Sequence, residues 1–331
     1  MTARTEPVAA SVKQQLPNTI PLDEIRRAHE RIAPHVVRTP LVRLEVAGRE
    51  LYLKLENLQP IGSFKLRGAS NAMLLADRDT LREGVWTASA GNMAQGVAWC
   101  ARAFGVPCRV VVPDHAPAAK TDAVQRLGAS IVRVPFQDWW QILVTHEWSD
   151  ARGLFIHPVS DRNVMAGNGT IGLEIAEDLA DVDSVIVPYG GGGLSCGIAS
   201  ALKALTPNVK VFAAEVDTAA PLAPSLEAGQ RVEVTYTPSF VDGMGSRGIL
   251  EEMWPLAQGL LAGSLVVTLR QVADAVRVLA ERARVIAEGA GAAALATVQA
   301  GLAPEGKIVC VVSGGNIDTS KLVRILHGEI P

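Results

Sequence analysis

The stretch SVIVPYGGGGLSCG, residues 184–197, reads as a short apolar strand that runs directly into four glycines and the start of a helix. A strand followed by a glycine-rich turn and a helix is the repeating unit of parallel α/β sheets. Four consecutive glycines exceed what a tight turn requires, and a bare backbone lets several N–H groups converge on one anion. The stretch therefore predicts an α/β fold with a phosphate-binding loop at Gly190–Gly193.

The same unit recurs on both sides of this stretch. Strand-like runs that alternate with helical patterns are GVWTAS (84–89), CRVVVP (108–113), SIVRVP (130–135), VKVFAAE (209–215) and KIVCVVS (307–313). Their grouping predicts a large lobe of residues 21–83 and 151–331, a small mobile lobe of residues 84–150, and a flexible N-terminal arm of residues 1–20. Ligands of such sheets bind beyond the carboxyl ends of the strands, so the loops there are the candidate site.

The composition narrows the class of partner. The chain has 331 residues, of which 48% are hydrophobic and 20% charged, and its net charge is -3. No basic run suits nucleic acid or a membrane surface, and no apolar stretch reaches the length of a membrane span or a signal peptide. Four cysteines without a C-x-x-C pair are typical of reduced thiols. We therefore expect a soluble, cytoplasmic protein with a small-molecule substrate.

A lysine near the N-terminus is the second candidate feature. NLQPIGSFKLRGASNAML (57–74) predicts a turn and a helix that Ser63 caps, with Lys65 in the first helical turn. The positive end of the helix dipole disfavours a charged ammonium there, and a neutral amine is a nucleophile. An amine together with a phosphate-binding loop is what an aldehyde cofactor bearing a phosphate requires, and pyridoxal phosphate fits.

Rival motifs lead to other chemistries. GLSCG (193–197) satisfies the G-x-S-x-G pattern of a hydrolase that would use Ser195 as nucleophile and His327 as base. That interpretation leaves Lys65 and the other strand-end loops without a role, and no HGGG-type oxyanion segment is present. The dinucleotide fingerprint is nearly met, but Ser195 stands in its third glycine position. Six histidines show no ligand spacing, so no metal site is predicted.

Six segments, taken in order, resemble the motifs of one enzyme family. They are GSFKLRGA, SAGNMAQGVA, HPVSDRNVMAGNGTIGLEI, GGGGL, EGAGAAALA and SGGNID. Together they resemble the fold-type II pyridoxal-phosphate enzymes, in the threonine/serine dehydratase and serine racemase branch, over about residues 20–328. The resemblance implies the two-lobed fold of the tryptophan synthase β chain, with parallel sheets flanked by helices, and a homodimer.

The resemblance also implies an activity. This is β-elimination of a 3-hydroxy amino acid, such as L-threonine or L-serine, to a 2-keto acid and ammonia. An amino-acid racemase of the same fold, the hydrolase using Ser195, and a binding module without turnover are the alternatives.

The family's functional residues carry over to matching positions. Lys65 would form the Schiff base with the cofactor and act as the catalytic base. The other cofactor contacts implied are Phe64 and Glu288 at the ring, Asn92 at the phenolic oxygen, Ser313 at the pyridine nitrogen, and Gly190, Gly191, Gly192, Gly193 and Leu194 at the phosphate. The substrate carboxylate would be bound by the loop that contains Ser89, Ala90, Gly91 and Met93. A serine cannot protonate the pyridine as a carboxylate would, which favours elimination.

Departures from the family pattern sharpen these expectations. Met93 stands where most relatives have histidine, which points to a less usual substrate. Glu215 matches one ligand of metal-activated relatives, but Pro221 occupies the position of their aspartate, so no metal is expected. The chain ends at Pro331, so no regulatory domain is expected. Ala90 replaces the serine that racemases use as a second acid or base, which predicts elimination without appreciable racemisation.

Overall fold

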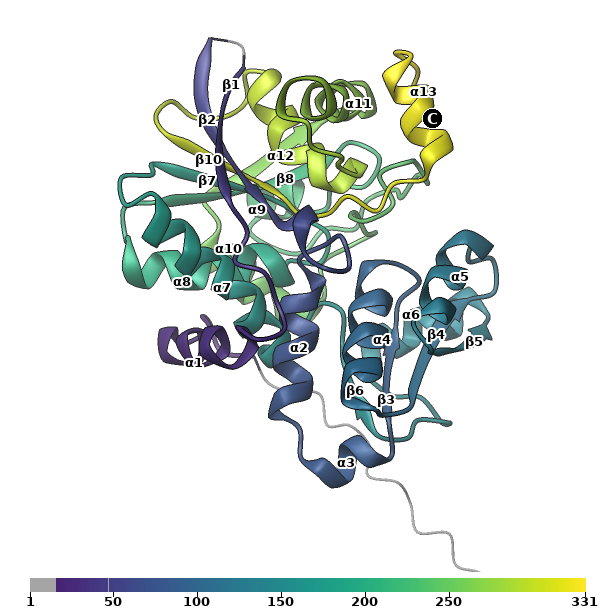
Figure 1. The fold of residues 1–331 in the computed structure, drawn as a ribbon. Coiled ribbons are helices and arrows are strands. Elements are labelled where there is room, and N and C mark those ends of the chain that lie inside the picture. Colours follow the sequence, from purple (N-terminus) through teal and green to yellow (C-terminus); the bar gives the residue numbers. More distant parts are fainter. Residues whose placement is uncertain (1–15, 47) are drawn as a thin grey trace, which may run out of the picture.

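The computed structural model describes residues 16–46 and 48–331 and contains two lobes, each built on its own sheet (Figure 1). The large sheet has the order β1-β2-β10-β7-β8-β9, with strands β1 Leu41–Val46, β2 Arg49–Leu55, β7 Ser184–Pro188, β8 Lys210–Val216, β9 Gly263–Val267 and β10 Ile308–Val312. Within the described residues, β1 and β2 pair antiparallel and every other neighbouring pair is parallel. The predicted α/β class with parallel sheets is therefore confirmed.

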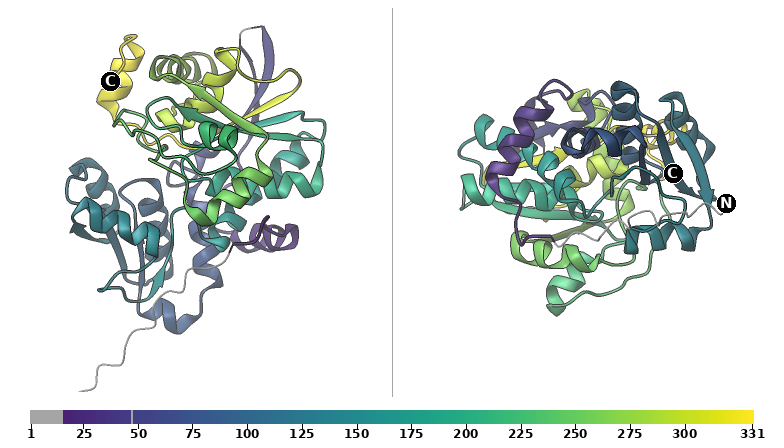
Figure 2. Two further views of the ribbon diagram at one scale, coloured as in Figure 1. Left: turned by 180° about the vertical axis from the view of Figure 1, so that it is seen from behind. Right: turned by 90° about the horizontal axis from the view of Figure 1, so that it is seen from below.

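Helices cover both faces of the large sheet (Figure 2). One face packs against α1 Leu22–Ile32, α7 Arg162–Asp178, α8 Gly193–Leu205 and α10 Trp254–Leu260, and the other against α11 Leu269–Val278, α12 Gly289–Gln299 and α13 Thr319–Leu326. The sequence of α12, GAGAAALATVQ, has small side chains that let it approach the strands closely, and most of it is buried. Shorter elements are η1 Glu56–Leu58, α9 Leu222–Ala228, η2 Glu251–Met253 and η3 Leu279–Ala283.

The small lobe is a four-stranded parallel sheet in the order β5-β4-β3-β6. Its elements are β3 Val85–Ala88, α4 Asn92–Phe104, β4 Cys108–Pro113, α5 Ala118–Arg126, β5 Ser130–Val134, α6 Phe136–Thr145 and β6 Leu154–Phe155. The edge strand β6 lies past residue 150, where the sequence places the boundary of this lobe. Trp86 stacks on Phe155 of that strand, with ring centroids 4.0 Å apart, and so anchors β6 to the small lobe.

The helix α2, Lys65–Leu75, joins the two lobes and is followed by α3, Arg78–Arg82. It contacts α7 of the large lobe and α4 of the small lobe, so it lies at their border (Figure 1).

A buried ionic cluster holds α2 against the large lobe. The guanidinium of Arg67 donates from Nε to Glu56 at 2.8 Å and from Nη1 to Glu174 at 2.6 Å. The ammonium of Lys54 donates to Glu174 at 2.6 Å, and all four side chains are almost completely buried. Removing one member would leave an unpaired buried charge, so this cluster makes the position of α2 specific.

The remaining expectations concern the N-terminal arm, the cysteines and the membrane. Residues 1–15 of the predicted arm lie outside the described residues, and its last residue, Ile20, is buried with its N–H donating to Ser200 Oγ at 3.0 Å. All four cysteines are free and buried. Within the described ranges, no helix has both the length and the apolar character needed to span a bilayer.

Candidate active site

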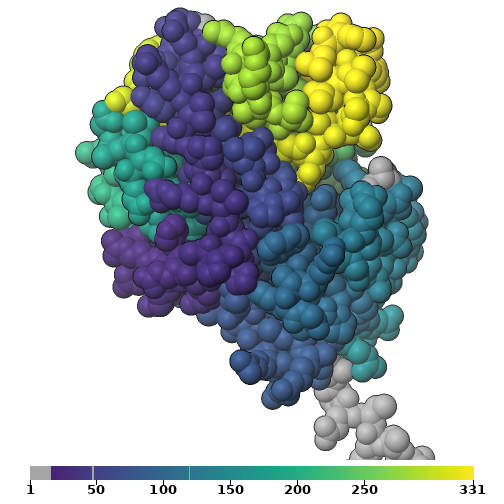
Figure 3. All heavy atoms as spheres, in the orientation of Figure 1, coloured from purple at the N-terminus to yellow at the C-terminus, as the bar shows by residue number. Residues whose placement is uncertain are grey.

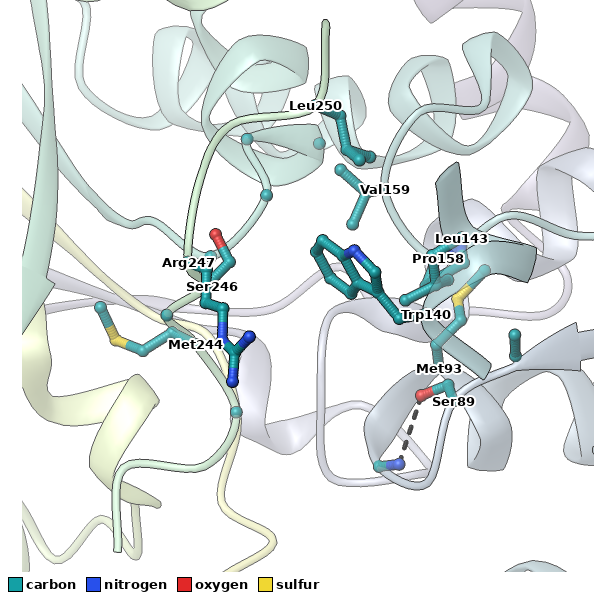
Figure 4. A pocket seen from close by; sticks show the side chains of 18 of the residues that line it. Ser89, Met93, Trp140, Leu143, Pro158, Val159, Met244, Ser246, Arg247 and Leu250 are labelled. Carbon is teal, nitrogen blue, oxygen red and sulfur yellow. Dashed lines mark hydrogen bonds between the residues drawn. The ribbon is translucent and has the colours of Figure 1, made fainter. Parts of the chain in front are cut away.

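A cavity of about 1150 Å³ lies between the two lobes (Figure 4). The structure brings to its wall every residue that the sequence proposes for the site: Phe64, Lys65, Ser89, Ala90, Gly91, Asn92, Met93, Gly190, Gly191, Gly192, Gly193, Leu194, Glu288 and Ser313. These residues follow β2, β3, β7 and β10 in the chain or, for Glu288, precede α12. The juxtaposition agrees with ligand binding at the carboxyl ends of parallel strands.

Lys65 is the first residue of α2 and faces this cavity. Its Nζ donates to the carbonyl oxygen of Pro158 at 2.6 Å. Burial lowers the pKa of Lys65 to about 8, because no carboxylate compensates the lost hydration of the ammonium. The sequence attributes a lowered charge to the helix dipole, whereas in the structure desolvation is the cause.

The expected helix cap at Ser63 is wrong. Phe64 occupies the N-cap position without a side-chain cap, and the buried hydroxyl of Ser63 has no hydrogen-bond partner among the described residues. Backbone contacts hold the turn instead. The N–H of Phe64 donates to the carbonyl of Ser313 at 3.0 Å, and Ser63 forms an isolated bridge with Gly314. This pairing of distant segments places Lys65 next to the end of β10, which local sequence patterns do not reveal.

The glycine loop between β7 and α8 is shaped by Val159. A Cβ on Gly191 would lie 2.5 Å from Val159 Cγ1, and one on Gly193 would lie 2.6 Å from the Val159 carbonyl oxygen. Gly192 has φ +96°, a left-handed conformation that favours glycine. The N–H groups of Gly190, Gly191 and Gly192 donate to no described residue. They remain available to an anion at the N-terminus of α8, which fits a bound phosphate.

Two asparagines and a glutamate form a chain across the cavity. Asn92 Nδ2 donates to Glu288 Oε1 at 2.7 Å, and Asn316 Nδ2 donates to Asn92 Oδ1 at 2.8 Å. Burial raises the pKa of Glu288 to about 7, because the hydrogen bond that its carboxylate accepts from Asn92, the one bond it makes with a described residue, does not offset the lost hydration. Asn316 belongs to the SGGNID segment, and the sequence predicts no role for it. It orients Asn92, whose second amide hydrogen stays free for a cofactor oxygen.

The small-lobe side of the cavity is the loop that precedes α4. Ser89 Oγ accepts a hydrogen bond from the N–H of Gly91 at 3.2 Å, as the dashed line in Figure 4 shows. Met93 is only 2% exposed and packs into the hydrophobic core of the small lobe. The residue that replaces the family's histidine therefore contributes packing at this wall rather than a polar group.

Two features raised from the sequence have structural roles elsewhere. Ser195 is fully buried in α8, where its hydroxyl donates to the Gly192 carbonyl at 3.2 Å, and it does not line the cavity. A hydrolase needs an accessible nucleophile, so the geometry gives that interpretation no support. The Glu215 carboxylate accepts from the N–H groups of Leu222 and Ala223, at 2.9 and 3.0 Å, and so caps α9 directly after Pro221.

Ionic contacts between the lobes surround the cavity. Asp242 of the large lobe lies 3.1 Å from Lys120 Nζ on α5 and 3.3 Å from Lys321 Nζ on α13. His146, at the end of α6, lies 3.4 Å from the Glu252 carboxylate in η2. The space-filling view shows α13, in yellow, close above the small lobe (Figure 3). Opening the cavity by moving the small lobe would separate the contacts of Lys120 and His146.

Comparisons with known proteins agree with this geometry. The model of the family described as "Pyridoxal-phosphate dependent enzyme" matches residues 32–314. An L-threonine ammonia-lyase of Thermotoga maritima is 40% identical over 93% of this chain and 78% of its own. Maize serine racemase superposes with a TM-score of 0.84 at 33% identity, over 92% of this chain and 96% of its own. The processed form of threonine deaminase isoform 2 from Solanum lycopersicum superposes with a TM-score of 0.81 at 31% identity, over 99% of each chain.

Proposed function

The chain belongs to the pyridoxal-phosphate dependent enzyme family, and from this membership we propose that it eliminates water from a 3-hydroxy amino acid such as L-threonine or L-serine. The resulting enamine then takes up water and hydrolyses, so the net products are a 2-keto acid and ammonia. The similarity to ammonia-lyases that act on L-threonine supports this reaction. The observation that carries the proposal is the buried amine of Lys65, which shares a cavity with the open amides of the glycine loop. These are the two anchors that an aldehyde phosphate cofactor needs.

The remaining cofactor contacts would come from residues that line the cavity. The amides of Gly190–Gly193 and Leu194 would bind the phosphate, and Phe64 would pack against the ring. The hydroxyl of Ser313 would bond the pyridine nitrogen, and the second amide hydrogen of Asn92 Nδ2 would bond the phenolic oxygen. The bound cofactor supplies an electron sink for the electron pair released at the substrate's α-carbon. The hydroxyl of Ser313 would protonate the pyridine nitrogen less completely than a carboxylate would, so the cofactor would withdraw electrons less strongly. This favours prompt loss of the substrate's β-hydroxyl.

Lys65 moves the protons of the reaction. Burial lowers the pKa of Lys65 to about 8, so the neutral amine that can remove the α-proton is more accessible than in an ordinary lysine. The carbonyl of Pro158 orients Nζ through a 2.6 Å hydrogen bond. The substrate carboxylate is bound by the open N–H groups at the start of α4, next to Ser89, Ala90 and Gly91.

The panel that tests the proposal measures ammonia release from L-serine, L-threonine and other 3-hydroxy amino acids. We expect a visible cofactor absorbance that borohydride bleaches, together with ammonia release that requires Lys65. A protein that binds the cofactor but releases no ammonia from any substrate would be a binding module instead.

Stereochemistry separates the lyase from a racemase. Ala90 offers a methyl group on the loop where a second acid or base would stand, and a methyl group cannot transfer a proton. We expect L-serine to yield pyruvate with little D-serine, and Ala90→Ser to introduce measurable racemisation while slowing elimination. D-serine formed by the wild-type protein at a rate comparable to pyruvate would identify a racemase.

We also propose that the protein acts in the cytoplasm as a homodimer and that the small lobe moves to close the cavity. Light scattering on a size-exclusion column tests the dimer. Fluorescence of Trp140, which lines the cavity on the small lobe, reports closure when substrate binds.

A further inference from the structure

The cavity between the lobes must hold both the cofactor and the substrate. Its volume of about 1150 Å³ exceeds the range of about 300–1,000 Å³ that is typical of small-molecule sites. Beyond Lys65, the extension is lined by Trp139 and Trp140 of α6 on one side and by the 231–250 segment on the other. Figure 4 shows Trp140 and Arg247 reaching into this space from the two sides. A substrate side chain longer than that of threonine would extend into the space between these two residues.

Arg247 is an exposed cation that lines this extension. Its guanidinium makes no hydrogen bond and no ion pair with any residue that the structure describes, while its backbone carbonyl accepts from the N–H of Val234 at 2.8 Å. The nearby Arg231 differs, because it donates to the Ile249 carbonyl at 3.3 Å and lies 3.9 Å from the Glu251 carboxylate. Arg231 and Arg247 thus line the same wall, and Arg247 has no ion-pair partner among the described residues.

The carboxylates around Arg247 are mostly engaged elsewhere. Asp242 is paired with two lysines, Glu252 with His146, and Glu251 with Arg231. Glu233 lines the same wall but lies beyond ion-pair distance of Arg247. An unpaired guanidinium presents five donors in a planar fork, which matches a carboxylate in a bidentate arrangement.

We propose that Arg247 binds a carboxylate at the end of the substrate's side chain, so that the preferred substrate is a 3-hydroxy amino acid with an acidic side chain. This inference rests on the proposed elimination and names its substrate class. The α-carboxylate would lie at the loop before α4, and the second carboxylate would lie across the cavity at Arg247.

The test compares acids with amides of equal length. The ratio of kcat/KM for 3-hydroxyaspartate to that for 3-hydroxyasparagine, and the same ratio for 3-hydroxyglutamate and 3-hydroxyglutamine, is measured on the holoenzyme. In at least one pair, we expect kcat/KM for the acid to exceed that for the amide by more than 10-fold. Arg247→Gln should lower that ratio by roughly 10- to 100-fold, as expected for a hydrogen bond between charged groups. Arg231→Gln is the matched control and should leave the ratio unchanged.

The outcomes separate the two proposals. Ammonia release from L-threonine with equal use of acid and amide, or a ratio that Arg247→Gln does not change, would overturn the role of Arg247 but not the elimination. No ammonia from any substrate would overturn the elimination. In that case calorimetric binding of L-aspartate against L-asparagine still decides the inference, because a preference for L-aspartate that Arg247→Gln removes is its direct consequence.

Discussion

Lys65 and Arg67 stand on the same helix with one residue between them, yet their environments are opposite. Arg67 is buried against Glu56 and Glu174; burial works against its charge, but the two carboxylates raise its pKa. Lys65 contacts the carbonyl oxygen of Pro158 and the Phe64 ring but no carboxylate among the described residues, and burial lowers its pKa to about 8. The comparison teaches that the carboxylates, rather than burial itself, decide whether a buried cation stays charged. One end of α2 therefore holds a structural ion and a reactive amine.

The largest effect on activity should come from removing the reactive amine of Lys65. Lys65→Ala deletes both the tether of the cofactor and the base, so ammonia release should fall by at least about 10⁴-fold. The melting temperature of the apoprotein should change little, because burial disfavours the ammonium of Lys65 and this offsets the loss of its hydrogen bond to Pro158. A variant that keeps substantial ammonia release would contradict the proposed role of Lys65.

Removing the structural cation, Arg67, should instead lower the stability of the fold. Arg67→Met leaves Glu56 without its cation and should cost about 3–5 kcal/mol in the free energy of unfolding, measured with urea. The double variant Arg67→Met/Glu56→Gln should recover part of this loss, because Glu174 keeps Lys54 as a partner. If the double variant is no more stable than the single one, unpaired charge is not the cause.

Glu288 extends the comparison to an acid. It is buried without a cation in hydrogen-bond contact, and burial raises its pKa to about 7 from the ordinary 4.5. A raised carboxyl pKa means that folding stability is lost as pH rises from 4.5 through 7. As pH rises from 4.5 through 7, the free energy of unfolding of Glu288→Gln should therefore increase by up to about 3 kcal/mol relative to that of the wild type. Melting temperatures of both apoproteins at about pH 5 and pH 8 measure this, with the exposed Glu83→Gln as a control that should show no trend.

The smallest effect concerns the rate of cofactor capture. A lowered pKa means that the neutral amine of Lys65 grows about tenfold per pH unit below 8 and levels above it. The rate at which apoprotein takes up pyridoxal phosphate, followed by absorbance, should have the same profile. A rate that still rises steeply between about pH 9 and 10, as for an ordinary lysine, would show that burial does not tune this amine.

The sequence predicts one half of this comparison and misses the other. Lys65 and the glycine loop are readable because a strand, its turn and the helix after it are contiguous, and the family motifs contain both. Arg67 stands in the same quoted motif, but its partner Glu174 lies 107 positions further along the chain. The ionic contacts between the lobes and the backbone bond from Phe64 to Ser313 are missed for the same reason. Such contacts depend on tertiary packing, which periodicity along the chain does not encode.

The pairing of β2 with β10 has a consequence for how the protein is made. Leu51 lies opposite Ile308, and the N–H of Phe64 donates to the carbonyl of Ser313. The hairpin of β1 and β2 therefore cannot complete its pairing until β10, the last strand that the structure describes, has been synthesised. During synthesis on the ribosome, a nascent chain that already displays Lys65 has no Ser313 beside it. Pairing across so long a loop is slow and leaves strand edges exposed. The cofactor site is therefore completed only after Ser313 has been synthesised and has left the ribosome, and a chaperone that shields β2 until then would raise the yield of active protein.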